Sequence, residues 1–142
     1  MEQGLARRGG RRRLAGEREA APFELRVAQA GRAALARIDG PLSGEHCPRL
    51  LDGVRPLCRG LRRVVLDLRR TQYIDSSGIR ALLQLQQEVE AGKGELRLVV
   101  MPGSRVERTL SLLRLTAHFQ TFGTASEAWI RAARTILSGA DA

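Results

Sequence analysis

Short apolar runs with the alternation of β-strands follow one another along the chain, and stretches with helical periodicity separate them. Residues 23–30 alternate apolar and polar side chains, which is the period of a half-buried strand, and residues 32–40 continue as a second strand after a hairpin-like break. The apolar run Val64–Leu66 predicts a buried central strand. Residues 95–101 alternate again, and residues 118–122 are a short fifth candidate. The pattern predicts a layered fold around one sheet.

The first two helical stretches lie on either side of the predicted central strand. Apolar residues at helical spacing cover roughly residues 44–60, where Ser43 is the expected N-cap and Pro48 lies in or near the first turn. A second amphipathic stretch begins at Ser77. It is expected to end near residues 92–94, where one of the two glycines takes the left-handed C-terminal position.

Two later helices begin with capping boxes, in which a hydroxyl and a carboxylate three residues later satisfy free backbone N–H groups. The first box is Ser104–Glu107 and the second is Thr124–Glu127. Trp129 is expected to be a core anchor, because it lies on the apolar face of the second helix. The periodicity predicts that these side chains face inward: Val106, Leu110 and Leu113 in the first helix, and Trp129, Ala133, Ile136 and Leu137 in the second.

The predicted order of elements is β-β-α-β-α-β-α-β-α, with about four helices. Strands that alternate with helices imply parallel βαβ units, and the leading hairpin adds an antiparallel strand, so we predict an α/β fold with a mixed, mostly parallel sheet. A length of 142 residues suits one domain, which we assign to residues 22–138. Residues 1–21, rich in Gly and Arg, and residues 139–142 are expected to be disordered.

Charge and composition narrow the class of function. The net charge is +9, but residues 1–20 hold six arginines against three glutamates, and the other basic residues are scattered without an aromatic ladder. Direct nucleic-acid binding is therefore not expected. No run of 18 apolar residues and no secretory signal occur, which predicts a cytoplasmic protein without membrane insertion. Neither the two histidines nor the two cysteines, Cys47 and Cys58, have ligand spacing, so we expect free thiols, no metal and no cofactor.

The stretch Asp75-Ser76-Ser77-Gly78 lies where the central strand passes into the second helix. Functional groups gather at this edge of α/β sheets, outside the carboxyl ends of the strands. One interpretation is a plain N-cap, since Asp or Ser at a helix start accepts hydrogen bonds from free N–H groups. A serine nucleophile is disfavoured because the GxSxG pattern is absent and neither histidine can be placed beside Ser76. The glycine-rich run and Lys of a phosphate-binding loop are also missing, so the sequence does not predict an enzyme.

Phosphorylation is the third interpretation of this stretch. A phosphate on a helix-capping serine gains the helix dipole and the free N–H groups, while it adds roughly two negative charges beside Asp75. We expect the fold to tolerate this change. A partner surface built for a neutral hydroxyl would instead meet like charge or a costly desolvation. The sequence thus permits a switch that acts through surface electrostatics without large refolding.

Residues 64–129 resemble a STAS domain, the fold of anti-sigma factor antagonists and of the cytoplasmic tails of sulphate transporters. The most specific part is a strand that ends in Leu-Asp-Leu, followed by a short link and by Ile-Asp-Ser-Ser-Gly, residues 74–78, at the start of a helix. The resemblance extends over about residues 23–137. It implies a single STAS domain that is not itself an enzyme.

The resemblance also implies a function and a site. In the antagonist branch, the first serine after the motif aspartate is phosphorylated by an anti-sigma factor that is itself a serine kinase, and that position is Ser76 here. Unphosphorylated protein would bind this kinase and free the sigma factor. Phosphorylation would break the complex, and a PP2C-type phosphatase would reset it. The implied partner-binding residues are Asp75, Ser77, Gly78, Ile79 and Arg80, with Pro41 and Ser43 in the bordering loop.

The bordering loop departs from the family pattern. Where the family commonly has Gly-Glu-Leu-Asp, this chain has Gly40-Pro41-Leu42-Ser43, which lacks both carboxylates. The alternative hypothesis is a non-switching STAS scaffold, either in a signalling assembly or as a subunit of a membrane transporter complex. The presence of Ser76, which can accept a phosphate, favours the switch.

Overall fold

The structure, a computed structural model, describes residues 22–129. Two sets of predictions lie outside the described residues: the disorder expected at both termini, and the inward orientation expected for residues after Trp129. They concern residues 1–21 and 130–142. The elements are β1 (Glu24–Ala30), β2 (Ala33–Asp39), α2 (Cys47–Val54), the 3-10 helix η1 (Arg55–Cys58), β3 (Arg63–Asp67), α3 (Ser76–Ala91), β4 (Glu95–Val99), α4 (Arg105–Leu112) and β5 (Gln120–Phe122). A further helical segment begins at Ala125.

The five strands form one sheet in the order β1-β2-β3-β4-β5. β1 pairs antiparallel with β2, and the other three pairs are parallel. The predicted α/β fold with a mixed, mostly parallel sheet is therefore confirmed, and the elements follow the predicted order. Because β2, β3 and β4 run in the same direction, their carboxyl ends and the loops that follow them meet at one edge of the sheet.

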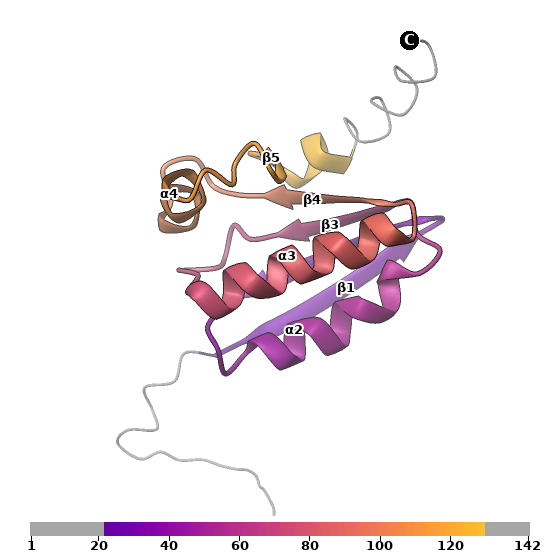
Figure 1. Ribbon diagram of the computed structural model, residues 1–142, viewed down its shortest axis with the longest axis horizontal. Coiled ribbons are helices and arrows are strands. Elements are labelled where there is room, and N and C mark those ends of the chain that lie inside the picture. Colours follow the sequence, from indigo (N-terminus) through magenta and orange to yellow (C-terminus); the bar gives the residue numbers. More distant parts are fainter. Residues whose placement is uncertain (1–21, 130–142) are drawn as a thin grey trace, which may run out of the picture.

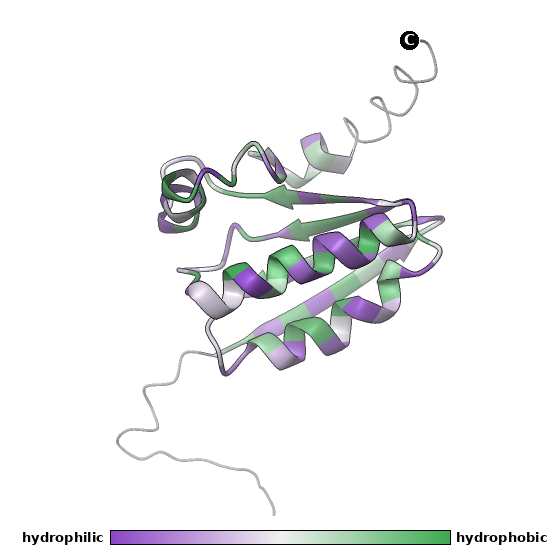
Figure 2. Ribbon diagram, viewed as in Figure 1, coloured by the Kyte–Doolittle hydropathy of each residue, from purple (hydrophilic) through white to green (hydrophobic). Residues whose placement is uncertain are grey.

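One face of the sheet carries the main core. Figure 1 shows α2 and α3 side by side on this face, and the two helices contact each other. Each helix has alternating hydrophobic and hydrophilic stripes, whereas β3 is hydrophobic over most of its length (Figure 2). The apolar side of α3 is buried at Ile79, Leu82, Leu85 and Val89, which repeat at helical spacing. Burial of this stripe fixes α3, and with it the site at its first residue, against the sheet.

The opposite face carries a smaller cluster under the last helical segment. Val65 and Val99 are fully buried there against Ala128, and Trp129 packs against them. The backbone N–H of Glu127 donates to the Thr124 hydroxyl at 3.0 Å, as half of the predicted capping box. Within the described residues, no helix has the length and the apolar character needed to cross a membrane.

The first helix differs from its predicted bounds of residues 44–60. It begins at Cys47, and the side chain of Ser43 does not cap it; the Ser43 carbonyl instead accepts hydrogen bonds from the N–H groups of His46 and Cys47 in a tight turn. The α-helix ends at Val54 and passes into η1, which contains Pro56. Proline has no N–H to donate and its ring crowds the preceding turn, so it ends the regular α-helix.

Two smaller predictions are also wrong. The left-handed residue after α3 is Lys93, with φ 69°, and neither neighbouring glycine takes that position. In α4, Val106 and Leu110 are buried as predicted, but Leu113 is 53% exposed because the helix ends at Leu112. Half of the predicted capping box at Ser104 forms, since its hydroxyl accepts from the N–H of Glu107 at 3.1 Å. The Glu107 carboxylate accepts from the N–H of Gly103 at 2.6 Å, while the N–H of Ser104 donates to the carbonyl of Met101.

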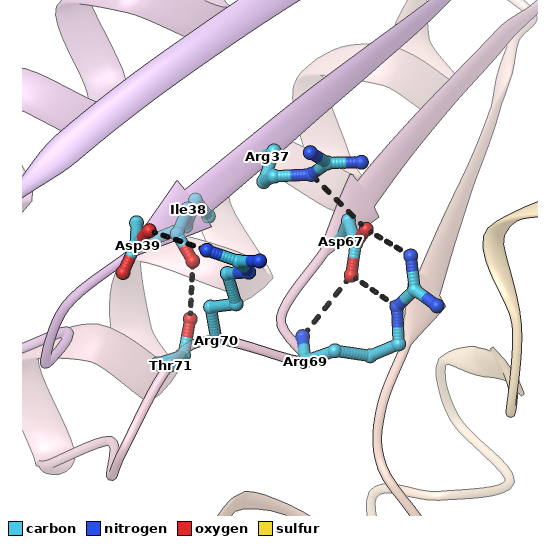
Figure 3. A network of polar contacts seen from close by, with 7 residues as sticks. All are labelled: Arg37, Ile38, Asp39, Asp67, Arg69, Arg70 and Thr71. Carbon is cyan, nitrogen blue, oxygen red and sulfur yellow. Dashed lines mark hydrogen bonds and ion pairs between the residues drawn. The ribbon is translucent and has the colours of Figure 1, made fainter.

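A buried carboxylate ends the central strand (Figure 3). Asp67 is almost fully buried, and Arg69 holds it with three hydrogen bonds, of 3.1 Å from its backbone N–H and of 3.0 and 2.8 Å from its guanidinium. Two residues further on, the Thr71 hydroxyl donates to the carbonyl of Ile38 at 3.1 Å. These contacts give the loop between β3 and α3 a fixed path.

Asp67→Asn is expected to destabilise the fold in a pH-dependent way. Burial raises the pKa of Asp67, but the hydrogen bonds and charge of Arg69, with the charge of Arg37, outweigh burial and hold that pKa below its ordinary value. The ionised carboxylate therefore stabilises the fold above the unfolded-state pKa of about 4, and this stabilisation is lost as the pH falls through the folded-state pKa. We expect a loss of about 1–3 kcal/mol at pH 7 that shrinks below pH ~4.

Urea unfolding of the wild type and of Asp67→Asn, at pH 7 and at pH 3, measures the difference between their free energies of unfolding. Asp39→Asn is the control, because Asp39 is half-exposed and its contact with Arg70 is 3.5 Å long, so its loss is expected to stay below about 0.5 kcal/mol. A loss at Asp67 that does not change with pH would contradict the assignment.

Candidate functional site

Two loops meet beside the first residue of α3. The loop after β2 and the loop before α3 form a parallel bridge between Leu42 and Ile74. The N–H of Leu42 donates to the carbonyl of Tyr73 at 3.0 Å, and the N–H of Asp75 donates to the carbonyl of Leu42 at 3.3 Å. Leu42 is fully buried. The loop 40–44, which the family resemblance implied to border the candidate serine, is therefore fixed there by backbone hydrogen bonds.

Asp75 joins the two loops and caps α3. It has an extended backbone, and its Oδ1 accepts a hydrogen bond from the N–H of Gly78 at 2.9 Å. Its Oδ2 accepts from the N–H of Gly44 at 3.1 Å. The predicted N-cap is confirmed, and the same carboxylate also holds the neighbouring loop. With both oxygens engaged inside the protein, the carboxylate positions the site.

Gly78 lets the helix start close against the loop. A Cβ atom at this position would lie 2.5 Å from the carbonyl oxygen of Leu42 and 2.6 Å from the side chain of Ile74. Real Cβ atoms do not approach other atoms so closely, so any larger residue must push α3 and the loop apart. Gly78 thus sets the distance between Ser76 and the loop 40–44.

The two serines have different environments. Ser76, the first residue of α3, is exposed, and within residues 22–129 no partner occupies its hydroxyl. Ser77 is half-buried, and its hydroxyl lies 3.5 Å from the position of a Cβ on Gly44. A modifying enzyme can therefore reach the Ser76 hydroxyl, whereas that of Ser77 faces the neighbouring loop.

Arg80 lies one turn after Ser76 on the same side of α3, since residues four apart are neighbours on a helix surface. Both residues are exposed. A guanidinium at this spacing is suited to pair with a phosphate on Ser76. The spacing was visible in the sequence, but only the structure shows that both side chains reach the surface.

The remaining predicted site residues differ in how far they are buried. Ser43 is half-buried and belongs to the turn that precedes α2. Pro41, Gly78 and Ile79 are buried. The structure therefore brings all the predicted residues around the start of α3. Pro41, Gly78 and Ile79, however, are packed inside the protein and do not present side chains to a partner.

His46 holds the loop to Phe23, the residue before β1. Its ring stacks on Phe23 with centroids 4.7 Å apart, and its Nδ1 lies 2.9 Å from the carbonyl oxygen of Pro41. Because a carbonyl only accepts, Nδ1 carries a proton. This role is structural, and no pattern in the sequence indicated it. The ring nitrogens contact Pro41, Ser43 and Glu45, so His46 is not placed as a base for Ser76.

The cysteines add no chemistry at the site. Cys47 in α2 and Cys58 in η1 are free and buried, which agrees with the predicted free thiols. Burial raises the pKa of both, that of Cys58 to about 11, so the thiols stay protonated at neutral pH. In the part of the chain that the structure describes, no group of three or more His, Cys, Asp or Glu side chains is placed to hold a metal ion.

An exposed aromatic residue lies close to the serine in sequence. Tyr73 is 37% exposed, and the guanidinium of Arg105 lies 5.3 Å from the centre of its ring. Tyr and Arg side chains are enriched among residues that dominate binding at protein interfaces. This pair joins the loop before α3 to the start of α4, and sequence reasoning did not single it out because its members are 32 positions apart.

Comparisons with known proteins agree with the observed fold. The profile of the STAS domain family covers residues 24–128. The fold is similar to that of an anti-sigma factor antagonist from Mycobacterium paratuberculosis, with a TM-score of 0.71, 16% identity and coverage of 79% of this chain and 95% of that chain. No curated protein matches the chain in sequence.

Two further solved structures share the fold. The phosphorylated form of the Bacillus cell fate determinant SpoIIAA has a TM-score of 0.58 and 20% identity, with coverage of 76% of this chain and 98% of that chain. A sulfate transporter family protein from Wolinella succinogenes has a TM-score of 0.61 and 20% identity, with coverage of 73% and 87%. At these identities the likeness shows the shared fold.

Gly78→Ala is expected to destabilise the protein although alanine is the better helix former by about 1 kcal/mol. The added methyl group clashes with Leu42 and Ile74, and overpacking of this kind costs about 1–3 kcal/mol. Gly44→Ala is the matched control, because its Cβ would make only ordinary contact with Ser77 at 3.5 Å. Thermal unfolding compares them, and a Gly78→Ala protein as stable as the wild type would contradict the packing argument.

Asp75→Ala is expected to lower the free energy of unfolding by about 1–3 kcal/mol, because two backbone N–H groups lose their acceptor. Ser104→Ala provides the comparison, since that N-cap side chain accepts from one N–H only and should cost about 1 kcal/mol. Chemical denaturation measures both. A smaller loss at Asp75 than at Ser104 would show that the link to Gly44 does not hold the loop.

Proposed function

The chain belongs to the STAS domain family, and we propose that it is an anti-sigma factor antagonist switched by phosphorylation of Ser76. In the unphosphorylated state it binds an anti-sigma factor serine kinase in the cytoplasm and so releases a sigma factor. Phosphorylation by that kinase ends the interaction, and a PP2C-type phosphatase restores it. The chain supplies a binding surface and a phosphate acceptor, and the catalysis belongs to its partners.

The observation that carries this proposal is the exposed Ser76 at the start of a 16-residue helix, whose hydroxyl has no partner among the residues that the structure describes. A kinase must place the acceptor hydroxyl against the transferred phosphoryl group, so the hydroxyl has to be accessible. Ser76 meets this requirement without local unfolding. Ser77 does not, because it faces Gly44.

The surroundings of Ser76 also favour a phosphate once it is attached. The free N–H groups and the dipole at the start of α3 attract negative charge, and Arg80 adds a cation one turn away. Asp75 already accepts hydrogen bonds through both oxygens, so its internal contacts do not need to change. The folded domain can therefore carry the phosphate with its loops in place.

The partner would meet a changed surface. A phosphate adds roughly two negative charges at a position where the unmodified site offers a neutral hydroxyl. Burying that charge against a surface built for a hydroxyl costs several kcal/mol. Tyr73, three residues before Ser76, and Arg105 provide an exposed aromatic and cationic pair on which a kinase can anchor.

Incubation of the full chain with ATP and the host's anti-sigma factor kinases, followed by intact-mass measurement, tests the modification. We expect one phosphate per chain on the wild type and none on Ser76→Ala, while Ser77→Ala remains a substrate. A phosphate that persists on Ser76→Ala would overturn the assignment of the acceptor.

Ser76→Asp is expected to weaken kinase binding by roughly 30-fold or more, which corresponds to about 2 kcal/mol. Ser126→Asp is the matched control, because Ser126 is an exposed serine in the first turn of the helical segment that begins at Ala125. It receives the same charge, but its helical segment packs on the other face of the sheet through Ala128 and Trp129. Binding by titration calorimetry should be unchanged for Ser126→Asp, and equal affinities for all three proteins would contradict the switch.

The same fold occurs in the sulfate transporter family protein, so a non-switching scaffold is the second candidate. The two functions give different results in the mass experiment. If no kinase phosphorylates the chain and a binding partner holds wild type and Ser76→Asp equally well, the scaffold replaces the switch as the function.

A further inference from the structure

A polar cavity of about 240 Å³ lies at the carboxyl ends of β2 and β3, and Ser76 is not among its lining residues. It is lined by Arg37, Asp67, Arg69, Arg70 and Met101. Arg37 and Asp67 are register partners on adjacent strands and alternate with core residues, so they point to the face opposite α2 and α3. Figure 3 shows the guanidinium groups of Arg37 and Arg69 on two sides of the Asp67 carboxylate.

The arginines differ in how far they are already engaged. Arg69 makes two guanidinium hydrogen bonds to Asp67, of 3.0 and 2.8 Å, so this pair is mutually satisfied. Arg37 reaches Asp67 only through its Nε at 3.6 Å. Among residues 22–129, the guanidinium of Arg70 reaches only Asp39, at 3.5 Å. In the described part of the chain, the terminal nitrogens of Arg37 and most donors of Arg70 remain available to a ligand.

Charge and size indicate the class of ligand. Three guanidinium groups face the Asp67 carboxylate in the lining and the Asp39 carboxylate beside Arg70, which leaves an excess of one positive charge around the cavity. A phosphate group carries about −1.5 to −2 charges at neutral pH and offers several acceptor oxygens, which guanidinium donors match well. A water molecule occupies about 30 Å³ of liquid, so the cavity has room for a phosphate and a few attached atoms. It is smaller than the roughly 300–1,000 Å³ of pockets for drug-sized ligands.

We propose that this cavity binds a small phosphate-bearing ligand, with Arg37 and Arg70 as its direct contacts. The Arg69–Asp67 pair forms a fixed floor, since its hydrogen bonds are complete without the ligand. The position agrees with the general tendency of α/β sheets to bind ligands outside the carboxyl ends of their parallel strands. The site is separate from the phosphorylation of Ser76 and does not depend on it.

Inorganic phosphate is the probe. We would titrate it into the ¹⁵N-labelled full chain at constant ionic strength and follow backbone and arginine side-chain signals. The expected result is saturable shifts at residues 37 and 67–70, in the wild type and equally in Ser76→Ala. Shifts confined to residues 76–78 would mean that phosphate binds the start of α3 instead, and would overturn the proposal.

Arg37→Gln/Arg70→Gln is expected to weaken phosphate binding at least tenfold. Both side chains are well exposed, 43% and 68%, so the change should leave the fold intact, which the dispersion of the spectra verifies. Arg26→Gln/Arg108→Gln removes the same charge from exposed residues outside the cavity and should bind phosphate like the wild type. Equal affinities for all three proteins would show that only net charge attracts the ion, and would overturn the site.

Acetate distinguishes the class of ligand. It carries one charge and two oxygens, so its affinity for the wild type should be at least tenfold lower than that of phosphate. Equal affinities for acetate and phosphate would contradict a phosphate site.

Discussion

The carboxylate of Asp75 is the interaction on which the site depends. One oxygen accepts from Gly78 in the first turn of α3 and the other accepts from Gly44 in the loop after β2, so two donors 34 residues apart share one acceptor group. Leu42 and Gly78 complete the junction, because the loop packs where a side chain on Gly78 would otherwise lie. Ser76, the first residue of α3, lies exposed at this fixed junction. Its exposure is thus a consequence of how its neighbours are buried and paired.

This arrangement separates the stability of the fold from the state of the serine. Hydrogen bonds that hold the junction come from the backbone and from Asp75, and none uses the Ser76 hydroxyl. A phosphate there meets the start of a helix and Arg80, both of which favour negative charge. The Asp67–Arg69 pair fixes the loop from its other end, near β3. Modification can therefore change what a partner encounters while the domain stays folded.

The features that could be predicted from the sequence are those that arise from short-range patterns. Alternation located the strands, and the hydroxyls at Ser104 and Thr124 located two helix starts. The role of Ser76 as a phosphate acceptor, which the family motif implies, stays a prediction. The misplaced start of α2 shows the limit, because Ser43 forms a turn with its carbonyl where a side-chain cap was expected. Whether the carbonyl or the hydroxyl of Ser43 accepts these hydrogen bonds depends on the path of the loop, which the local sequence does not determine.

Contacts between residues far apart in the chain could not be predicted from the sequence. The contact of Arg37 with Asp67 follows from the pairing of two parallel strands, which brings together residues 30 positions apart. The same holds for Tyr73 with Arg105 and for Gly44 with Asp75. Each joins loops that meet only because the carboxyl ends of the strands share one edge of the sheet. The candidate ligand cavity appears for this reason in the structure alone.

The central claim is that a phosphate on Ser76 alters the surface and leaves the fold unchanged. Backbone amide shifts and hydrogen exchange, compared between the unmodified chain and the chain with phosphoserine at position 76, test it most directly. The account predicts changes confined to residues 43–46 and 74–80, with the exchange protection of β2, β3 and β4 unchanged. Shifts that spread through the sheet, or loss of protection in its central strands, would contradict it.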